Sequence, residues 1–248
     1  MKQLKKLLVV GGLHGDESSG VDLVRRLQKV GLNNIKAVVA NPEAVGKKVR
    51  FLETDMNRSF GVETPISLEE RRASNLKKEF LVCDAVIDVH NTRARGTTCA
   101  ITVCEPNKFH LGLATYFGFT KVVVMSPSGS LISVCPDRSI SLEIENGRKK
   151  EFSTNFLVGK IVTMGDRSGG KKKLDVYQYV NKVSRKTLMR LGVDLDLIAN
   201  FKKLSLGVLK KLALGRSSDY YPIFFKSNEK EEISFILVKY VGSKSLTM

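Results

Sequence analysis

The chain of 248 residues carries 41 lysines and arginines against 25 aspartates and glutamates, which gives a formal net charge of +16. Its hydrophobic content of 42% and charged content of 27% are typical of a soluble globular protein with a substantial core. No apolar run approaches the ~18 residues of a membrane-spanning helix, so the composition argues against an integral membrane protein.

The basic excess has three interpretations. It can reflect a lysine-rich solvated surface, a positive field that attracts a small anionic substrate, or phosphate contacts with a nucleic acid. The basic residues are dispersed except at residues 149–150 and 171–173, and no nucleic-acid motif with interleaved aromatic residues is present. The sequence therefore favours the solvated surface and disfavours a nucleic-acid partner without excluding it.

The amino-terminal stretch predicts a buried strand that runs into a helix. Residues 7–10 form a short run of leucine and valine, typical of a strand covered on both faces. Glycines break the run, and residues 17–30 then carry apolar residues in steps of three and four, as on one face of a helix. His14 and Glu17 therefore lie at a strand-to-helix turn, where both side chains can project to one side.

A second histidine, His90, follows another apolar run at residues 85–89. Two ligands from one turn and a third from the end of another strand are the usual arrangement at a catalytic zinc, whose fourth position stays open for water. The alternative is that His14 and His90 are hydrogen-bonded histidines in tight turns. The third histidine, His110, has the context of an ordinary surface or helix-start residue.

The remaining pattern alternates strands and helices. We expect strands at residues 35–40, 98–103, 121–125 and 139–144, and helices at 67–82, 110–118 and 152–164. Ser67 and Glu70 have the spacing of a capping box at the start of the first of these helices. Residues 49–60 are irregular and polar, and we expect an active-site loop there. The alternation predicts a three-layer α/β/α sandwich with a mixed, mostly parallel sheet.

A change in residue patterning near residue 170 predicts two domains, at residues 1–170 and 171–248. Residues 166–173 combine glycine with charge and are the best linker candidate. Residues 176–185 and 232–240 alternate apolar and polar side chains, so we expect a small, mostly β carboxy-terminal domain. Residues 201–215 can form an amphipathic helix on a membrane surface, but their glycines and two-residue leucine spacing favour β segments.

Four blocks carry a family resemblance: GGLHGDE, RFLETDMNRSF, DVHNT and SLEIE. In this order they resemble the succinylglutamate desuccinylase/aspartoacylase family, zinc deacylases related to the metallocarboxypeptidases. The likeness covers residues 1–145 and continues weakly around DYYPIFF. It implies a zinc-carboxypeptidase-like fold, hydrolysis of a linear amide bond, and one Zn²⁺ per chain held by His14, Glu17 and His90.

The resemblance also assigns roles to further residues. Glu143 is expected to be the general base and proton shuttle, which activates water and protonates the leaving amine. Arg50 is expected to stabilise the oxyanion, and Asn57 and Arg58 to hold a carboxylate of the substrate. From spacing alone Glu143 and Glu145 are indistinguishable, because alternate residues of a strand share a face.

Some of these positions have structural alternatives. Asp88 can orient a ligand imidazole as a hydrogen-bond acceptor, or it can be a polar residue at the end of a strand. An arginine of the polar loop can pair with Glu53 or Asp55 instead of binding substrate.

Three departures from the family pattern bear on the substrate. Glu145 stands where a glycine is usual. Its carboxylate can raise the pKa of the nearby Glu143 or point to solvent. Arg138 lies before Glu143, roughly where the aspartoacylase branch has an arginine for a second carboxylate, but out of register; it is kept as a substrate-binding candidate. No tyrosine follows YPIFF in register, so N-acetylaspartate is not indicated.

The sequence therefore predicts a zinc-dependent deacylase that acts on a small anionic N-acyl amino acid or a similar carboxylate-bearing amide. The alternatives are a carboxypeptidase-like metallopeptidase and, outside enzymes, a basic nucleic-acid-binding protein on a decayed hydrolase scaffold. The short apolar start leads directly into the histidine motif, so we expect no signal peptide. The four cysteines lack paired spacing, so we expect reduced thiols and a cytoplasmic protein. The acyl group, the amino acid and the oligomeric state are left open.

Overall fold

A nine-stranded sheet forms the centre of the computed structural model, which describes residues 5–145, 152–164, 173–214, 219–225 and 233–245. The strands are β1 (Leu7–Gly11), β2 (Ile35–Val39), β3 (Ala85–Thr92), β4 (Cys99–Thr102), β5 (Lys121–Val124), β6 (Ser139–Glu145), β7 (Lys173–Ser184), β8 (Tyr220–Ile223) and β9 (Ile233–Ser245). Their order is β2-β1-β3-β6-β4-β5-β7-β9-β8. The pairs β4/β6, β7/β9 and β8/β9 are antiparallel and the others parallel, so the predicted mixed, mostly parallel sheet is confirmed.

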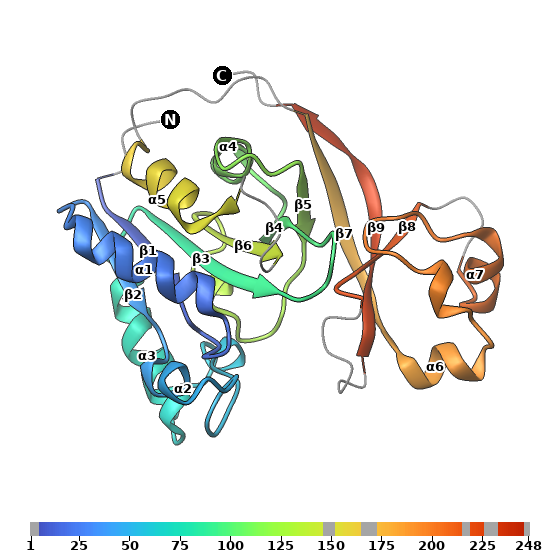
Figure 1. Ribbon diagram of the computed structural model, residues 1–248, viewed down its shortest axis with the longest axis horizontal. Helices are drawn as coiled ribbons and strands as arrows, with labels where there is room; N and C mark the ends of the chain where they lie inside the picture. The colour runs from blue at the N-terminus through green and yellow to red at the C-terminus, as the bar shows by residue number, and fades with distance from the viewer. Residues whose placement is uncertain (1–4, 146–151, 165–172, 215–218, 226–232, 246–248) are drawn as a thin grey trace.

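Helices cover both faces of this sheet (Figure 1). They are α1 (Ser18–Val30), α2 (Pro42–Lys47), α3 (Leu68–Phe80), α4 (Lys108–Tyr116), α5 (Thr154–Val162), α6 (Arg185–Arg190) and α7 (Leu206–Lys211), with short 3-10 turns η1 (Met56–Arg58), η2 (Leu131–Ser133) and η4 (Leu195–Leu197). Leu7 and Val9 of β1 pack with α1, α4 and α5, whereas Leu8 and Val10 pack with α3 on the opposite face. This alternation confirms the three-layer sandwich, and the predicted capping box at Ser67 begins α3.

The carboxy-terminal strands extend the same sheet. The start of β7 pairs with β5, and β7 continues as a long antiparallel pair with β9 (Figure 1). Both predicted strands, at residues 176–185 and 232–240, are thus present. The expected boundary at residue 170 lies outside the described residues, and the division into two domains stays a prediction. No helix in the described part of the chain is long and apolar enough to span a bilayer.

One carboxy-terminal prediction is wrong. Residues 201–215 contain helix α7 rather than the β segments that their leucine spacing favoured. The Ser205 side chain caps the helix by accepting from the Val208 N–H at 3.4 Å. The consecutive residues Val208 and Leu209 are both buried in an apolar cluster with Leu188 and Phe235, a pattern that a helix allows and an edge strand does not.

The turn after β1 depends on a close approach of two backbones. A Cβ on Gly11 would lie 2.3 Å from the carbonyl oxygen of Gly20, so α1 can begin directly behind the strand only because residue 11 has no side chain. On its other side β1 pairs in parallel with β3, and β3 with β6. Parallel pairing brings the carboxyl ends of these three strands to one edge of the sheet.

A buried carboxylate of α3 holds the polar loop before that helix. Glu69 Oε1 accepts from the Leu52 N–H at 2.7 Å and from the Asn41 side chain at 3.1 Å. Its Oε2 accepts from the N–H groups of Glu53 at 3.2 Å and Thr54 at 3.3 Å. Because Glu69 has no exposed surface, these donors replace water, and the loop is tied to the helix.

We expect Glu69→Gln to lower the free energy of unfolding at pH 7 by about 1–3 kcal/mol, because charge-assisted acceptors are lost. Burial alone would raise the pKa of Glu69, but the N–H donors hold it below its usual value. The stabilisation is therefore present above the unfolded pKa of about 4.3 and lost as the pH falls through the folded pKa. Denaturant unfolding between pH 7 and pH 3 should show the two proteins converging in acid. Glu63→Gln, at an exposed carboxylate, is the control; a difference that does not change with pH would contradict the assignment.

Candidate metal centre

The turn after β1 brings two predicted ligands together. His14 and Glu17 are 4% and 7% exposed, and Glu17 Oε1 lies 2.7 Å from His14 Nδ1. Backbone hydrogen bonds fix the turn: the Gly15 N–H donates to the Arg50 carbonyl at 3.1 Å, and the Glu17 N–H to the His14 carbonyl at 3.2 Å.

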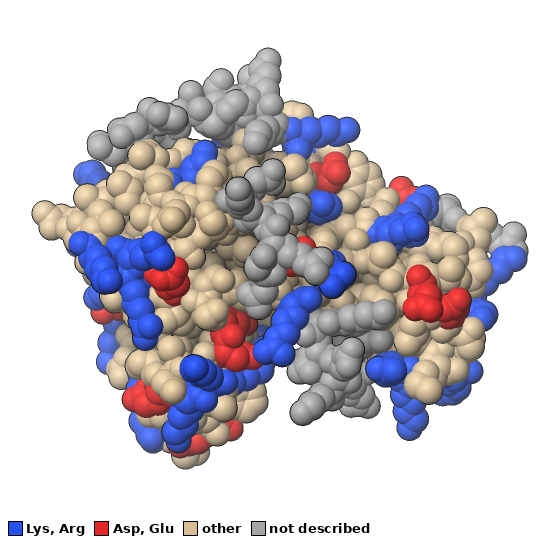
Figure 2. Space-filling model, viewed as in Figure 1, with Lys and Arg blue, Asp and Glu red and all other residues tan. Residues whose placement is uncertain are grey.

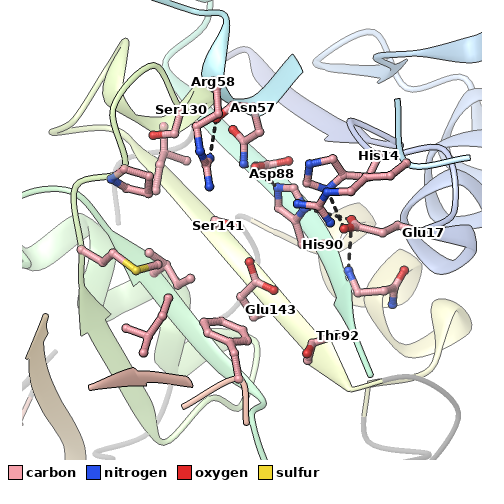
Figure 3. A pocket seen from close by; sticks show the side chains of 18 of the residues that line it. His14, Glu17, Asn57, Arg58, Asp88, His90, Thr92, Ser130, Ser141 and Glu143 are labelled. Atoms are coloured by element: carbon pink, nitrogen blue, oxygen red, sulfur yellow. Dashed lines mark hydrogen bonds and ion pairs between the residues drawn. The ribbon is translucent and has the colours of Figure 1, made fainter. Parts of the chain in front are cut away.

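His90 approaches the same carboxylate from β3. Its Nδ1 lies 2.8 Å from Glu17 Oε2, so one carboxylate faces both imidazoles (Figure 3). The ligand atoms of His14, Glu17 and His90 all lie within 4.8 Å of one another. Within the described residues, no other group of histidine, cysteine, aspartate and glutamate side chains has this spacing.

Each imidazole is fixed from behind by a second carboxylate. His14 Nε2 lies 3.0 Å from Asp55 Oδ1, and His90 Nε2 lies 2.8 Å from Asp88 Oδ2. Such carboxylate–histidine pairs leave the other ring nitrogen free for a metal. The contact agrees with the orienting role predicted for Asp88. Sequence reasoning missed this position of Asp55, because only the folding of the polar loop brings it to His14.

The electrostatics of the cluster favour positive charge. Burial lowers the pKa of His90, but Asp88 and Glu17 outweigh it and place the pKa well above its usual value. The pKa of His14 is also raised, against its burial, by Asp55 and Glu17. Burial alone would raise the pKa of Glu17, yet both imidazoles hold it well below its usual range. The cluster therefore attracts positive charge, and its two imidazoles and one carboxylate are a donor set that suits zinc.

Glu143 lies beside these ligands on β6, directly opposite His90 in the parallel pairing. Burial raises the pKa of its carboxyl to about 7; His90 opposes this shift, and Glu17 and Asp88 add to it. A carboxyl that titrates near neutrality can both accept and donate a proton. The position and the pKa suit a general base, and that role of Glu143 stays a prediction.

The loop residues reach the same edge of the sheet. Arg50 lines the cavity and its Nη2 lies 3.5 Å from Asp55 Oδ2, so the alternative ion pair within the loop is present. Asn57 Nδ2 lies 3.3 Å from His90 Nε2, and Asn57 Oδ1 accepts from the Leu131 N–H at 2.9 Å. Arg58 also lines the cavity, and its Nη1 donates to the Asn57 carbonyl at 2.6 Å. Substrate binding by Asn57 and Arg58 stays a prediction.

A cavity of about 340 Å³ joins these groups, and its lining combines polar and apolar residues. The polar part includes His14, Glu17, Asp88, His90 and Glu143. The apolar part comprises Ile101, Met125, Pro127, Ile132, Phe224, Phe235 and Ile236. Among the described residues, four cationic side chains also line the cavity: Arg50, Arg58, Arg93 and Lys182. Sequence reasoning missed Lys182, because nothing in an alternating strand indicates which residue will face a distant site.

Arg138 is not at the site, and its assignment as a substrate-binding residue is wrong. It precedes β6, whereas Glu143 lies near the other end of that strand. Five residues of strand separate the two by roughly 16 Å. The Arg138 Nη2 donates to the Phe80 carbonyl at 2.9 Å, so the guanidinium joins β6 to the end of α3.

His110 lies in the first turn of α4 and is buried, so its interpretation as a helix-start residue is confirmed and that as a surface residue is wrong. Its Nδ1 accepts from the Asn107 N–H at 3.2 Å in a capping box. It does not line the cavity.

We expect Asp55→Asn and Asp88→Asn to weaken zinc binding about 10-fold to 100-fold, because each removes a carboxylate behind a ligand imidazole. His14→Ala should lose the ion at equimolar zinc. Competition with a chromophoric chelator measures these affinities. Asp16→Asn, in the same turn but outside the ligand cluster, is the matched control and should retain the ion. Equal affinity in the wild type and His14→Ala would exclude the assigned ligands.

Comparisons with known proteins give the family. The model of the succinylglutamate desuccinylase/aspartoacylase catalytic domain matches residues 3–130, about half of the chain. A probable aspartoacylase of Trichodesmium erythraeum is 33% identical over 133 residues, which cover 47% of this chain and 45% of that protein. The rat N-acyl-aromatic-L-amino acid amidohydrolase (carboxylate-forming) is 33% identical over 135 residues, which cover 46% of this chain and 42% of that protein. The matched region thus spans less than half the length of these relatives.

Solved structures support the fold over the whole chain or nearly so. The succinylglutamate desuccinylase of Chromobacterium violaceum gives a TM-score of 0.73 at 18% identity and covers 97% of this chain and 86% of its own. Murine aminoacylase 3 gives 0.69 at 20% identity and covers 100% of both chains. On the match over residues 3–130, this chain belongs to the succinylglutamate desuccinylase/aspartoacylase family.

Proposed function

We propose that this protein is a zinc-dependent amidohydrolase that removes the acyl group from an N-acyl amino acid or a similar carboxylate-bearing amide. The proposal rests on the meeting of His14, Glu17 and His90 at one edge of the sheet, with Glu143 on the adjacent strand. The names of the relatives, aspartoacylase and N-acyl-aromatic-L-amino acid amidohydrolase, support this reaction class.

One zinc ion per chain would be held by Nδ1 of His14, Nδ1 of His90 and the Glu17 carboxylate. When bound, the ion supplies a Lewis acid that polarises an amide carbonyl and lowers the pKa of a water. Asp55 and Asp88 keep both imidazoles oriented for this task.

Glu143 carries the proton through the reaction. It accepts a proton from the attacking water as the carbon–oxygen bond forms, and it gives the proton to the amide nitrogen as the carbon–nitrogen bond breaks. Its pKa of about 7 suits both steps. Arg50 donates to the carbonyl oxygen as negative charge develops there, which requires its guanidinium to turn from Asp55 towards the substrate.

The mixed lining of the cavity supports a substrate with one charged and one apolar part. The cationic residues Arg50, Arg58, Arg93 and Lys182 suit a carboxylate. Of these, Lys182 lies opposite Ile236 in the β7/β9 pairing, so one cation adjoins the apolar part of the lining. A second carboxylate packed against the other apolar residues would lose its hydration. An apolar amino-acid side chain therefore fits better than that of aspartate.

On one face of the described residues, the basic side chains form no continuous track for a nucleic acid (Figure 2). On the face in Figure 2, basic side chains lie in separate groups with acidic ones between them. A phosphate backbone binds best to a continuous track of positive charge.

The four free cysteines agree with the reducing, cytoplasmic setting that we propose.

We expect Glu143→Gln to lower kcat about 10²-fold to 10⁴-fold, because the amide cannot accept the proton. Zinc content by atomic absorption should stay at that of the wild type. Glu105→Gln, at a carboxylate outside the cavity lining, should keep its activity. Turnover retained in Glu143→Gln would exclude the role assigned to Glu143.

We expect kcat/KM for N-acetyl-L-phenylalanine to exceed that for N-acetyl-L-aspartate by about 10-fold or more, because a second carboxylate would lose hydration against the apolar part of the lining. Met125→Lys adds a cation to that part and should lower the ratio of the two kcat/KM values. A panel with both compounds and short peptides measures this by amine release. Hydrolysis of the peptides alone would favour the metallopeptidase instead.

A further inference from the structure

Glu145 ties the connection between β3 and β4 to the end of β6. Its Oε2 accepts from the Gly96 N–H at 2.8 Å, and its own N–H donates to Thr98 Oγ1 at 3.3 Å. The cavity lining does not include Glu145. The carboxylate at the position where the family usually has glycine is therefore bound to a loop and does not join Glu143 at the site.

Asn200 holds the same connection, residues 93–98, from the carboxy-terminal part of the chain. Its Nδ2 donates to the Arg95 carbonyl at 2.8 Å, and its Oδ1 accepts from the Phe225 N–H at 2.7 Å. Ala94 and Thr97 are fully buried. The connection is thus anchored from two directions, and its exposed arginines extend from a fixed base.

Arg93 is the one of these two arginines that lines the cavity. Its side chain is 72% exposed, and its Nη2 lies 4.0 Å from Asp16 Oδ2, at the limit of an ion pair. An exposed ion pair of that length contributes little energy. The Arg93 guanidinium can therefore leave Asp16 and bind an anionic ligand instead. The side chain of Arg95 is also exposed but is not part of the lining.

We propose that Arg93 binds an anionic group of the ligand at the cavity mouth, and that Glu145 is a positioning residue that holds the 93–98 connection for it. This inference rests on the proposed use of the cavity by a carboxylate-bearing substrate. On this proposal, having glutamate instead of glycine at position 145 affects the affinity for the ligand. It does not disturb proton transfer by Glu143.

The test is calorimetric titration of the zinc-loaded protein with inorganic phosphate at low ionic strength. Arg93→Ala should weaken binding about threefold to tenfold, because one charge-assisted contact is lost. Arg95→Ala removes the same charge from the same connection and should change the affinity by less than about twofold. The affinity of Glu145→Ala for phosphate should be close to that of Arg93→Ala. The double variant should bind phosphate no more weakly than Arg93→Ala alone.

Hydrogen exchange supplies the second measurement. The Gly96 amide should exchange faster in Glu145→Ala, whereas Glu145→Gln keeps an acceptor oxygen and should retain both the protection and the affinity of the wild type. Should Glu145→Ala fail to fold, Glu145→Asp, with its shorter reach, carries the same test.

Several outcomes would overturn the proposal. They are equal losses in Arg93→Ala and Arg95→Ala, no phosphate binding by the wild type, additive losses in the double variant, and unchanged exchange at Gly96. Neither measurement requires turnover, so a protein that hydrolyses no amide would defeat the proposed function without deciding the role of Arg93.

Discussion

One carboxylate facing two imidazoles is the constraint on which the site depends. Glu17 meets Nδ1 of His14 and Nδ1 of His90, and all three side chains are buried. Such a cluster is stable only if protons or a cation offset its negative charge. The parallel pairing of β1 with β3 and the glycine-dependent turn into α1 produce this meeting.

The polar loop serves the cluster in two ways. Asp55 orients His14 from behind, and Arg50 adds a guanidinium to the cavity lining. Neither position would persist if the loop moved freely. Glu69 of α3 prevents this by binding consecutive backbone N–H groups, so a helix on one face of the sheet fixes residues that act at its edge.

The family match and the rest of the chain contribute different parts of the cavity. The three candidate metal ligands and the polar loop lie within residues 3–130. Glu143 and the aromatic wall of Phe224 and Phe235 lie beyond them, where β6, β9 and the segment after β8 close the cavity. The candidate metal ligands thus lie in the matched region, and the candidate general base lies in the chain that follows it.

Local sequence patterns were enough to predict the alternation of strands and helices, the capping box at Ser67 and the two strands that lead to His14 and His90. These depend on local spacing and on apolar runs, which one segment carries alone. The folded structure was needed to show that Arg138 binds a backbone carbonyl away from the site, that Asp55 contacts His14 and that Lys182 lines the cavity. Such contacts join segments far apart in the chain, and their geometry is set by strand order and packing, which no local pattern encodes.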